Sequence, residues 1–162
     1  MRRCLDVIII TAMFIAVTLF QTRNMLGSGK QAPDFTLQST TGQSYQLSAL
    51  NGGKVLIVFW APWCGVCKVE SSNISAIHQA YQKDDSVTVI SIVLGYNNLQ
   101  EVKDFMTAHD VDYPVLLGDK QLNHDYKIDV FPTAYIISPN GEIEDGIVGY
   151  TSEFGLRWRL WL

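Results

Sequence analysis

Apolar residues recur along the chain in short continuous runs separated by polar segments. Residues 55–60 and 87–94 are such runs, and neither alternates apolar with polar positions. Runs of this length and composition are typical of strands buried on both faces of an α/β sheet. Shorter runs at 113–117 and 134–137, and an edge segment at 142–148, predict three further strands. The pattern therefore predicts an α/β domain built around a central sheet.

Helical patterns occupy the segments between these runs. A helix is expected from Cys64 to about Gln82, and a short one over residues 121–127. Asn98, with Glu101 three positions later, predicts an N-cap for a helix that ends near residue 109. The face of the first helix that we expect to be buried is formed by Val66, Val69, Glu70, Ile74, Ile77, Ala80 and Tyr81.

Two further elements are expected at the ends of the domain. Phe35–Leu37 and Tyr45–Leu47 flank a turn that contains glycine, so they predict a small β-hairpin. Near the C-terminus, Thr151 or Ser152 can cap a final amphipathic helix that runs to the last residue. The aromatic residues of that helix, which we expect to cover the sheet, are Phe154, Trp158 and Trp161.

The first 22 residues have the pattern of an export signal or a membrane anchor. Arg2 and Arg3 precede residues 7–20, which carry no charge. Because positive charge stays on the cytoplasmic side, the rest of the chain is expected to face outward. A cleaved signal is the alternative to a single uncleaved span, although the small residues 27–29 offer only a poor cleavage site. Residues 23–31 lack an apolar period and predict a tether.

The remaining segment, residues 32–162, has the length of one ordinary domain. The net charge of the chain is −4, and no run of lysine and arginine is present. This charge distribution gives no reason to expect a nucleic-acid partner.

Candidate chemistry is concentrated where the central strand meets the following helix. Cys64 and Cys67 lie there, in the stretch Trp60-Ala61-Pro62-Trp63-Cys64-Gly65-Val66-Cys67-Lys68. At a helix start, unpaired N–H groups and the helix dipole stabilise an anion, so they favour a thiolate at Cys64. Cys67 is one turn further in, within disulfide reach, and is expected to be more buried. We therefore expect Cys64 to attack and Cys67 to resolve.

A structural zinc site is the other common use of a Cys-x-x-Cys pair. It needs two more cysteine or histidine ligands at short spacing. Cys4 is the one other cysteine, and the three histidines, His78, His109 and His124, are scattered singly through the sequence. The spacing therefore favours redox chemistry and gives no metal site.

The Trp-Cys-x-x-Cys motif at Trp63, directly after a buried strand, resembles the active site of thioredoxin-fold proteins. The opening Ala32–Leu37, the position of Glu70 after Cys67, and Phe131–Thr133 resemble the membrane-anchored, extracytoplasmic branch that includes TlpA, ResA and the cytochrome-maturation thioredoxins. This resemblance extends from about residue 30 to residue 148. The amino-acid sequences of residues 60–68 and 149–153 also resemble those of the copper-sensitivity-suppressor members of that branch.

The resemblance implies an α/β thioredoxin fold: a central mixed sheet flanked by helices, with an N-terminal β-hairpin and an inserted strand and helix. It implies that Pro132 is cis and faces the cysteines, and that Phe131 offers its backbone N–H and C=O to an extended substrate. Trp63 belongs to the same expected substrate-binding surface. The resemblance also implies an uncleaved anchor in the cytoplasmic membrane, a catalytic domain in the periplasm or another extracytoplasmic space, and no cofactor.

Glu70 is the one charged residue on the expected buried face of its helix. It lies three residues after Cys67, so desolvation would raise its pKa toward the range useful for proton transfer. A surface glutamate paired with a lysine is the alternative. The resemblance favours the functional role, because Val58 occupies the place where thioredoxin has its buried aspartate.

Together these features predict an enzyme, a thiol-disulfide oxidoreductase that reduces disulfides of envelope proteins in cytochrome maturation or copper-stress defence. Its surroundings are oxidising, so it needs electrons from a membrane donor. Three alternatives use the same thiols: a disulfide-forming oxidant, a Cu(I)-binding module, and a peroxidase-like antioxidant. Peroxiredoxin-like proteins share the opening Ala32–Leu37, but the Thr-x-x-Cys motif of a peroxidatic thiol is absent at Cys64.

Overall fold

The computed structural model describes residues 9–13, 16, 25–50, 52–83 and 86–162. Its centre is a five-stranded mixed sheet with the strand order β5-β4-β3-β6-β7. β3 pairs in parallel with β4 and antiparallel with β6, while β5 and β7 form the two edges. The strands are β3 (Lys54–Trp60), β4 (Val87–Val93), β5 (Val115–Leu117), β6 (Thr133–Ile137) and β7 (Ile143–Val148).

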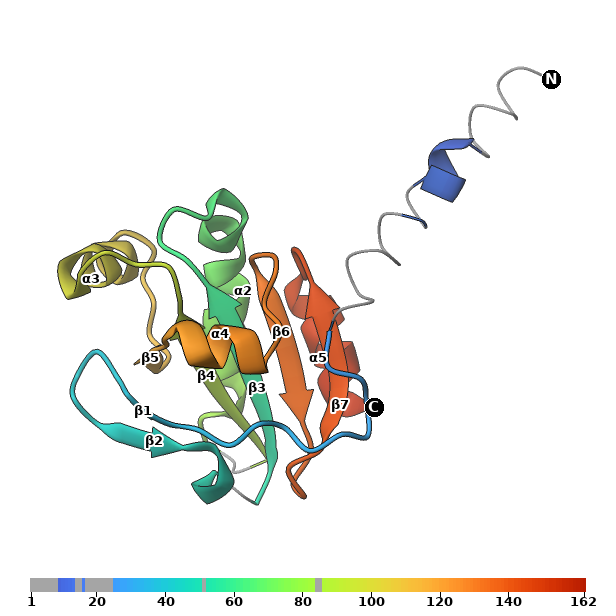
Figure 1. Cartoon of the computed structure of the whole chain (residues 1–162), viewed down its shortest axis with the longest axis horizontal. Helices are drawn as coiled ribbons and strands as arrows, with labels where there is room; N and C mark the ends of the chain where they lie inside the picture. The colour runs from blue at the N-terminus through green and yellow to red at the C-terminus, as the bar shows by residue number, and fades with distance from the viewer. Residues whose placement is uncertain (1–8, 14–15, 17–24, 51, 84–85) are drawn as a thin grey trace.

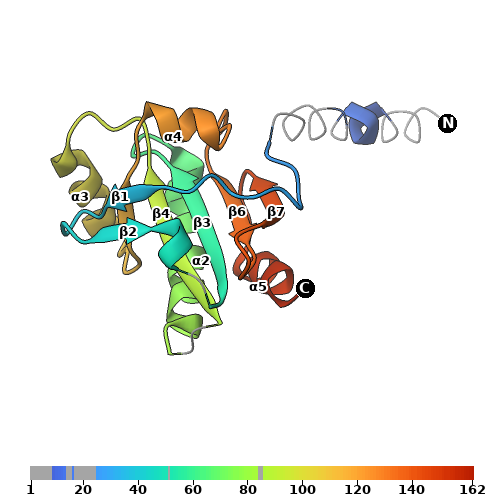
Figure 2. The ribbon, with the colours of Figure 1, turned by 60° about the horizontal axis from the view of Figure 1, so that its bottom comes forward.

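Helices cover both faces of this sheet (Figure 2). On one face, α2 (Gly65–Tyr81), α3 (Leu99–Ala108) and α5 (Glu153–Trp161) share a hydrophobic cluster with the sheet. On the other face, α4 (Lys120–Asp125) packs with the N-terminal segment. That segment carries an antiparallel hairpin, β1 (Thr36–Gln38) with β2 (Ser44–Gln46), followed by the 3-10 turn η1 (Leu47–Ala49).

The two-sided burial explains why β3 reads as an unbroken apolar run. Leu56, Val58 and Trp60 belong to the cluster beneath α2, whereas the residues between them belong to the cluster beneath α4. Each fully buried aliphatic or aromatic side chain contributes about 1.5–3 kcal/mol relative to exposure. A polar residue anywhere along this strand would lose that contribution on one face or the other.

Side-chain caps begin the helices that follow β4, β5 and β7. Asn98 accepts a hydrogen bond from the Glu101 N–H at 3.0 Å, as the sequence predicts. Ser152, one of the two predicted caps, accepts from the Gly155 N–H at 3.2 Å. The predicted mixed sheet, N-terminal hairpin and inserted strand and helix are thus confirmed, with bounds shifted by one or two residues.

The buried face of α2 differs from the prediction. Val66, Val69 and Ala80 are exposed, whereas Ser71 and Ser75 are buried. α2 packs against β4 on one side and α5 on another, so its buried face includes positions where small serines fit between elements. Hydrophobicity alone could not show that second contact. The predicted burial of Glu70 is confirmed.

The prediction for the aromatic residues of the last helix is wrong. Phe154, Trp158 and Trp161 are 77%, 53% and 74% exposed, and they do not cover the sheet. Leu156 and Leu160 are buried instead. These two leucines are one turn apart on a single face of the helix. Their side chains pack into the hydrophobic cluster that α5 shares with the sheet.

The segment predicted as a tether is attached to the domain over its described part. Met25 and Leu26 pack against the cluster beneath α4, and the Leu26 N–H donates to the Tyr135 hydroxyl at 3.3 Å. The Gly29 N–H donates to the Ile143 carbonyl at 2.8 Å. The described part of the predicted tether thus runs along the outer edge of β7, where backbone groups lack a strand partner.

The predicted membrane anchor, residues 1–22, lies largely outside the described residues. Within the described ranges, no helix has the length and apolar character needed to cross a membrane.

Leu156 and Trp161 provide a matched test of how α5 is seated. Leu156→Ala should lower the free energy of unfolding by roughly 2–5 kcal/mol, because it removes a buried side chain and leaves a cavity. Trp161→Ala should change it by less than about 0.5 kcal/mol, because that ring is exposed. Urea denaturation followed by circular dichroism measures both. Equal losses would show that the aromatic residues pack against the fold after all.

Candidate active site

Cys64 and Cys67 form a disulfide at the start of α2, with an S–S distance of 2.03 Å and a Cα–Cα distance of 5.3 Å. Cys64 is the N-cap residue of the helix, and its sulfur accepts a hydrogen bond from the Cys67 N–H at 3.1 Å. A tight turn after β3 brings the chain into the helix, since the Cys64 N–H donates to the Ala61 carbonyl at 3.0 Å. The buried end of β3 therefore fixes where the sulfur lies.

The helix position, rather than burial, distinguishes the two cysteines. Cys64 is 6% exposed and Cys67 is 4% exposed, so the expected difference in burial is small in the disulfide form. Only Cys64 occupies the N-cap, where the N–H groups and the helix dipole favour negative charge. The first turn of α2 contains no acidic residue that would oppose a thiolate there.

Trp63 is an exposed aromatic residue held next to the disulfide. Its Nε1–H donates to the Gly95 carbonyl at 3.2 Å, and its ring meets Phe131 edge to face with centroids 5.5 Å apart. Gly95 has a φ of +62°, and a Cβ atom there would lie 3.4 Å from Trp63 Nε1. That separation is an ordinary van der Waals contact, so the positive φ is what favours a glycine here. Gly95 carried no signal in the sequence analysis.

Phe131 lies beside Trp63, and Pro132, which the resemblance implied to be cis, follows it. The Phe131–Pro132 peptide bond is cis, and β6 begins at the next residue, Thr133. The Pro132 carbonyl accepts from the Gly149 N–H at 2.8 Å, which ties this segment to the end of β7. Phe131 also lines a cavity of about 510 Å³, together with Gly95 and residues at the start of α4. The structure therefore brings Trp63 and Phe131 together, and the buried Pro132 follows Phe131 through the cis bond.

Glu70 lies one turn beyond Cys67 on the buried side of α2. Burial raises the pKa of its carboxyl to about 7, and a hydrogen bond from the Thr151 N–H to Oε1, 2.7 Å long, opposes that rise. Burial, followed by the charges of Glu70 and Asp112, raises the pKa of Tyr113, so this phenol stays neutral. Glu70 is therefore close to half-protonated at neutral pH, where a carboxyl can both take and give a proton.

Two neighbours of Glu70 were not found from the sequence. Thr151 acts through its backbone N–H, which any residue except proline would provide. Tyr113 was recognised as the start of a strand, but nothing in its spacing linked it to α2. Both meet Glu70 because α5 and the segment before β5 fold onto the same face of the sheet.

A model of the AhpC/TSA family matches residues 28–145, which is most of the chain. The chain belongs to the AhpC/TSA family. Among curated members, the thioredoxin-like protein YneN of Bacillus subtilis is 33% identical over 121 residues, covering 75% of this chain and 71% of YneN. The thiol-disulfide oxidoreductase ResA of the same organism is 29% identical over 136 residues, covering 83% of this chain and 75% of ResA.

Solved structures of the same kind confirm the predicted thioredoxin fold. A protein from Chlorobium tepidum described as the thiol:disulfide interchange protein DsbE superposes with a TM-score of 0.76 at 25% identity, covering 84% of this chain and 96% of that protein. StoA of Bacillus subtilis gives a TM-score of 0.70 at 27% identity, covering 79% and 96%. This member of the AhpC/TSA family is a thiol-disulfide oxidoreductase of the ResA/DsbE type, with Cys64 and Cys67 as its Cys-x-x-Cys pair.

The raised pKa of Glu70 has a consequence for stability. In the unfolded chain this carboxyl has its ordinary pKa near 4.5, and in the folded protein about 7. Between these two values the folded state binds more protons, so stability should fall as pH rises from about 4.5 to about 7 and then level off. The loss attributable to Glu70 should be on the order of 3 kcal/mol.

Glu70→Gln removes this titration and keeps an oxygen for the Thr151 N–H. Urea denaturation of the oxidised wild-type and variant proteins across this pH range measures the difference. The variant should gain stability relative to the wild type as pH rises. A difference that does not change with pH would mean that Glu70 titrates in the folded protein as it does in the unfolded chain.

Proposed function

We propose that this protein is an extracytoplasmic, membrane-anchored oxidoreductase that reduces disulfides of envelope proteins. The observation that carries the proposal is the Cys64–Cys67 disulfide at the start of α2, with the buried carboxyl of Glu70 one turn below it. The export pattern of residues 1–22 supports the location. The family resemblance to TlpA and ResA supports the direction of the reaction.

In the reduced protein, the Cys64 thiolate attacks one sulfur of a substrate disulfide. A mixed disulfide forms between Cys64 and the substrate, and the other substrate sulfur leaves as a thiolate that takes up a proton. The Cys67 thiolate then attacks the Cys64 sulfur and displaces the second substrate thiol. Two electrons pass to the substrate, and the Cys64–Cys67 disulfide of the described structure is the product.

Glu70 serves the second step of this sequence. Cys67 must lose its proton before it can attack, and its side chain is buried on the same side of α2 as the Glu70 carboxyl. A carboxyl with a pKa of about 7 is a better proton acceptor than an exposed glutamate. The charge that it gains is stabilised in place by the Thr151 N–H.

The surface around the disulfide selects protein substrates. Trp63 is exposed and fixed by its hydrogen bond to Gly95, and Phe131 lies two residues before the first residue of β6. An extended substrate segment placed beside Phe131 can hydrogen-bond with its backbone, while Trp63 contacts the side chains that flank the substrate cysteine. Substrate recognition in this proposal therefore depends on the backbone more than on any charged group.

Regeneration needs a second protein. Outside the cytoplasm the surroundings are oxidising, so the disulfide must be reduced again by electrons from a membrane donor. No cofactor takes part in the exchange steps. Cytochrome maturation and copper-stress defence are the two settings that the resemblance favours.

Thiol trapping in cells separates this role from its alternatives. A reductase rests with its cysteines reduced, whereas a disulfide-forming oxidant rests with them oxidised. A Cu(I)-binding module would show no disulfide exchange in metal-free buffer. A peroxidase would consume hydroperoxide with a thiol donor.

Because the two cysteines occupy different positions, their serine variants should behave differently. Cys64→Ser should abolish exchange, because it removes the attacking thiolate. Cys67→Ser should still attack, but cannot resolve, so a covalent complex with the natural partner should accumulate. Non-reducing electrophoresis of membrane extracts, repeated with reductant, measures this complex. If Cys64→Ser traps the partner and Cys67→Ser does not, the assignment of the roles is reversed.

Glu70→Gln should slow the resolution step by roughly 10- to 100-fold and remove its pH dependence near neutrality. The side chain keeps its size and its hydrogen bond from the Thr151 N–H, so a folding defect is not expected. Rapid-mixing measurements separate attack by Cys64 from resolution by Cys67 across pH 5–9. An unchanged profile for resolution would exclude Glu70 as the proton acceptor.

A further inference from the structure

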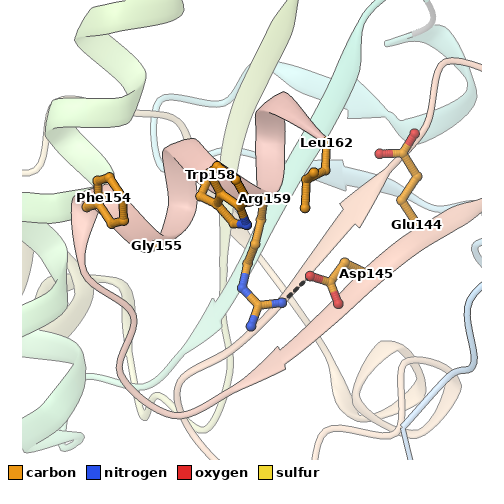
Figure 3. A pocket seen from close by; sticks show the side chains of 7 residues that line it. All are labelled: Glu144, Asp145, Phe154, Gly155, Trp158, Arg159 and Leu162. Atoms are coloured by element: carbon orange, nitrogen blue, oxygen red, sulfur yellow. Dashed lines mark hydrogen bonds and ion pairs between the residues drawn. The ribbon is translucent and has the colours of Figure 1, made fainter.

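The last helix carries a second apolar face that the fold does not use. Phe154, Trp158, Trp161 and Leu162 are each more than half exposed, and we call them the aromatic face of α5. The rings of Trp158 and Trp161 contact each other, with centroids 5.6 Å apart. Figure 3 shows Trp158 and Leu162 along one side of the helix. Exposed apolar patches of this kind mark surfaces that bind a protein or a membrane.

The aromatic face points away from the sheet. Each residue of an α-helix turns the direction of the side chain by about 100°. Residues 154, 158, 161 and 162 therefore share one side of the helix, and the buried residues Leu156 and Leu160 share the side almost opposite. No rotation of α5 could bury both sets against this domain. The occupant of the aromatic face must come from outside the folded domain.

The charged groups beside the aromatic face are already paired. Arg157 donates to Glu153 at 2.8 Å, and Arg159 pairs with Asp145 of β7, as Figure 3 shows. The cavity of about 620 Å³ between α5 and β7 is lined by this ion pair, by Glu144, and by Gly155 and apolar side chains. The Glu144 carboxylate pairs with Lys54 at 2.8 Å. The surface thus offers large amphipathic rings with little unpaired charge, which is the composition found where proteins meet lipid headgroups.

The path of the chain brings this edge of the domain close to the predicted anchor. Met25 lies against Gly146 of β7, and the Lys30 carbonyl accepts from the Ile143 N–H at 2.8 Å. Only two residues separate Met25 from the end of the predicted anchor at residue 22. Three Cα steps span at most roughly 11 Å. Figure 1 shows that the segment from residue 25 runs beside β7, and Figure 2 shows α5 on the other side of that strand.

We propose that the aromatic face of α5 lies in the headgroup region of the membrane that holds the anchor. The inference rests on the anchor of the proposed function. With so short a connection, the β7 edge cannot move far from the bilayer, and the helix next to that edge presents Trp158 and Trp161. Tryptophan prefers this interface because its ring is apolar and its N–H can still bond to water or lipid.

Quenching of tryptophan fluorescence by lipid bromine atoms tests the proposal on the full chain. The protein is incorporated into phosphatidylcholine vesicles whose acyl chains carry bromine near the headgroup, and into vesicles without bromine. Two matched variants separate the exposed tryptophans, and both keep the buried Trp60. Trp63→Phe retains Trp158 and Trp161 as exposed reporters, whereas the double variant Trp158→Phe, Trp161→Phe retains Trp63. Phenylalanine keeps the surface apolar in both.

The proposal expects brominated lipid to remove the same emission intensity from the wild type and from Trp63→Phe, and therefore a larger fraction of the variant's emission. The double variant should stay at the level of the unbrominated control. Quenching of the double variant as strong as that of the wild type would overturn it, because the signal would then come from elsewhere. Absence of quenching in all three proteins would overturn it as well. Emission from Trp158 and Trp161 that is shielded from iodide but unaffected by bromine would instead assign the face to a second copy of this chain.

Flotation of the same vesicles on a density gradient tests the predicted anchor separately from the placement of α5. Protein that floats without bromine quenching retains its anchor and overturns only the placement of α5. Protein that does not float lacks the anchor, which overturns that part of the proposed function and this inference together. Disulfide exchange, measured in the same samples, reports on the Cys64–Cys67 chemistry independently of both results.

Discussion

The site depends on one structural constraint: a strand buried on both faces ends at the point where a helix begins. β3 lies in the middle of the sheet, between β4 and β6, and its side chains pack into both hydrophobic clusters. Its end therefore cannot shift along the sheet without exposing part of the core. Because Cys64 follows after a single tight turn, the position of its sulfur is determined by the packing of β3 rather than by local interactions of the loop.

The other residues of the site come from two segments that lie next to this strand-helix junction. The loop after β4 supplies Gly95 beneath Trp63, and the segment before β6 supplies Phe131 and Pro132. These strands are the two hydrogen-bonded neighbours of β3. A sheet of this order therefore gathers on one surface groups that are nearly 70 residues apart in the sequence. The helices behind the sheet then enclose Glu70 and give its carboxyl a pKa near neutrality.

The sequence was sufficient for those parts of the fold that a local pattern determines. The strands could be predicted from their continuous apolar runs, the caps at Asn98 and Ser152 from their residue types, and the burial of Glu70 from its place on a helix face. The orientation of α2 and α5 could not be predicted. Each helix contacts two neighbours, and an exposed hydrophobic residue on a third side cannot be distinguished in the sequence from a buried one. Val69 and Trp158 were assigned to the core for that reason.

The site shows the same division. Cys64, Cys67 and Pro132 could be recognised from a short motif, since their chemistry needs those residue types at those places. Gly95 and Tyr113 could not, because their roles come from contacts between distant segments. The attachment of residues 25–31 to β7 was also missed, because backbone hydrogen bonds leave little trace in composition.

The hydrogen bond to Glu70 illustrates how hidden such a contact can be. Its donor is the main-chain N–H of Thr151, so nineteen of the twenty amino acids could stand at this position and still make the bond. Members of the family could thus share this feature of the site while differing freely in the residue that provides it. What must be preserved is the path of the backbone between β7 and α5, and a comparison of side chains would pass over it.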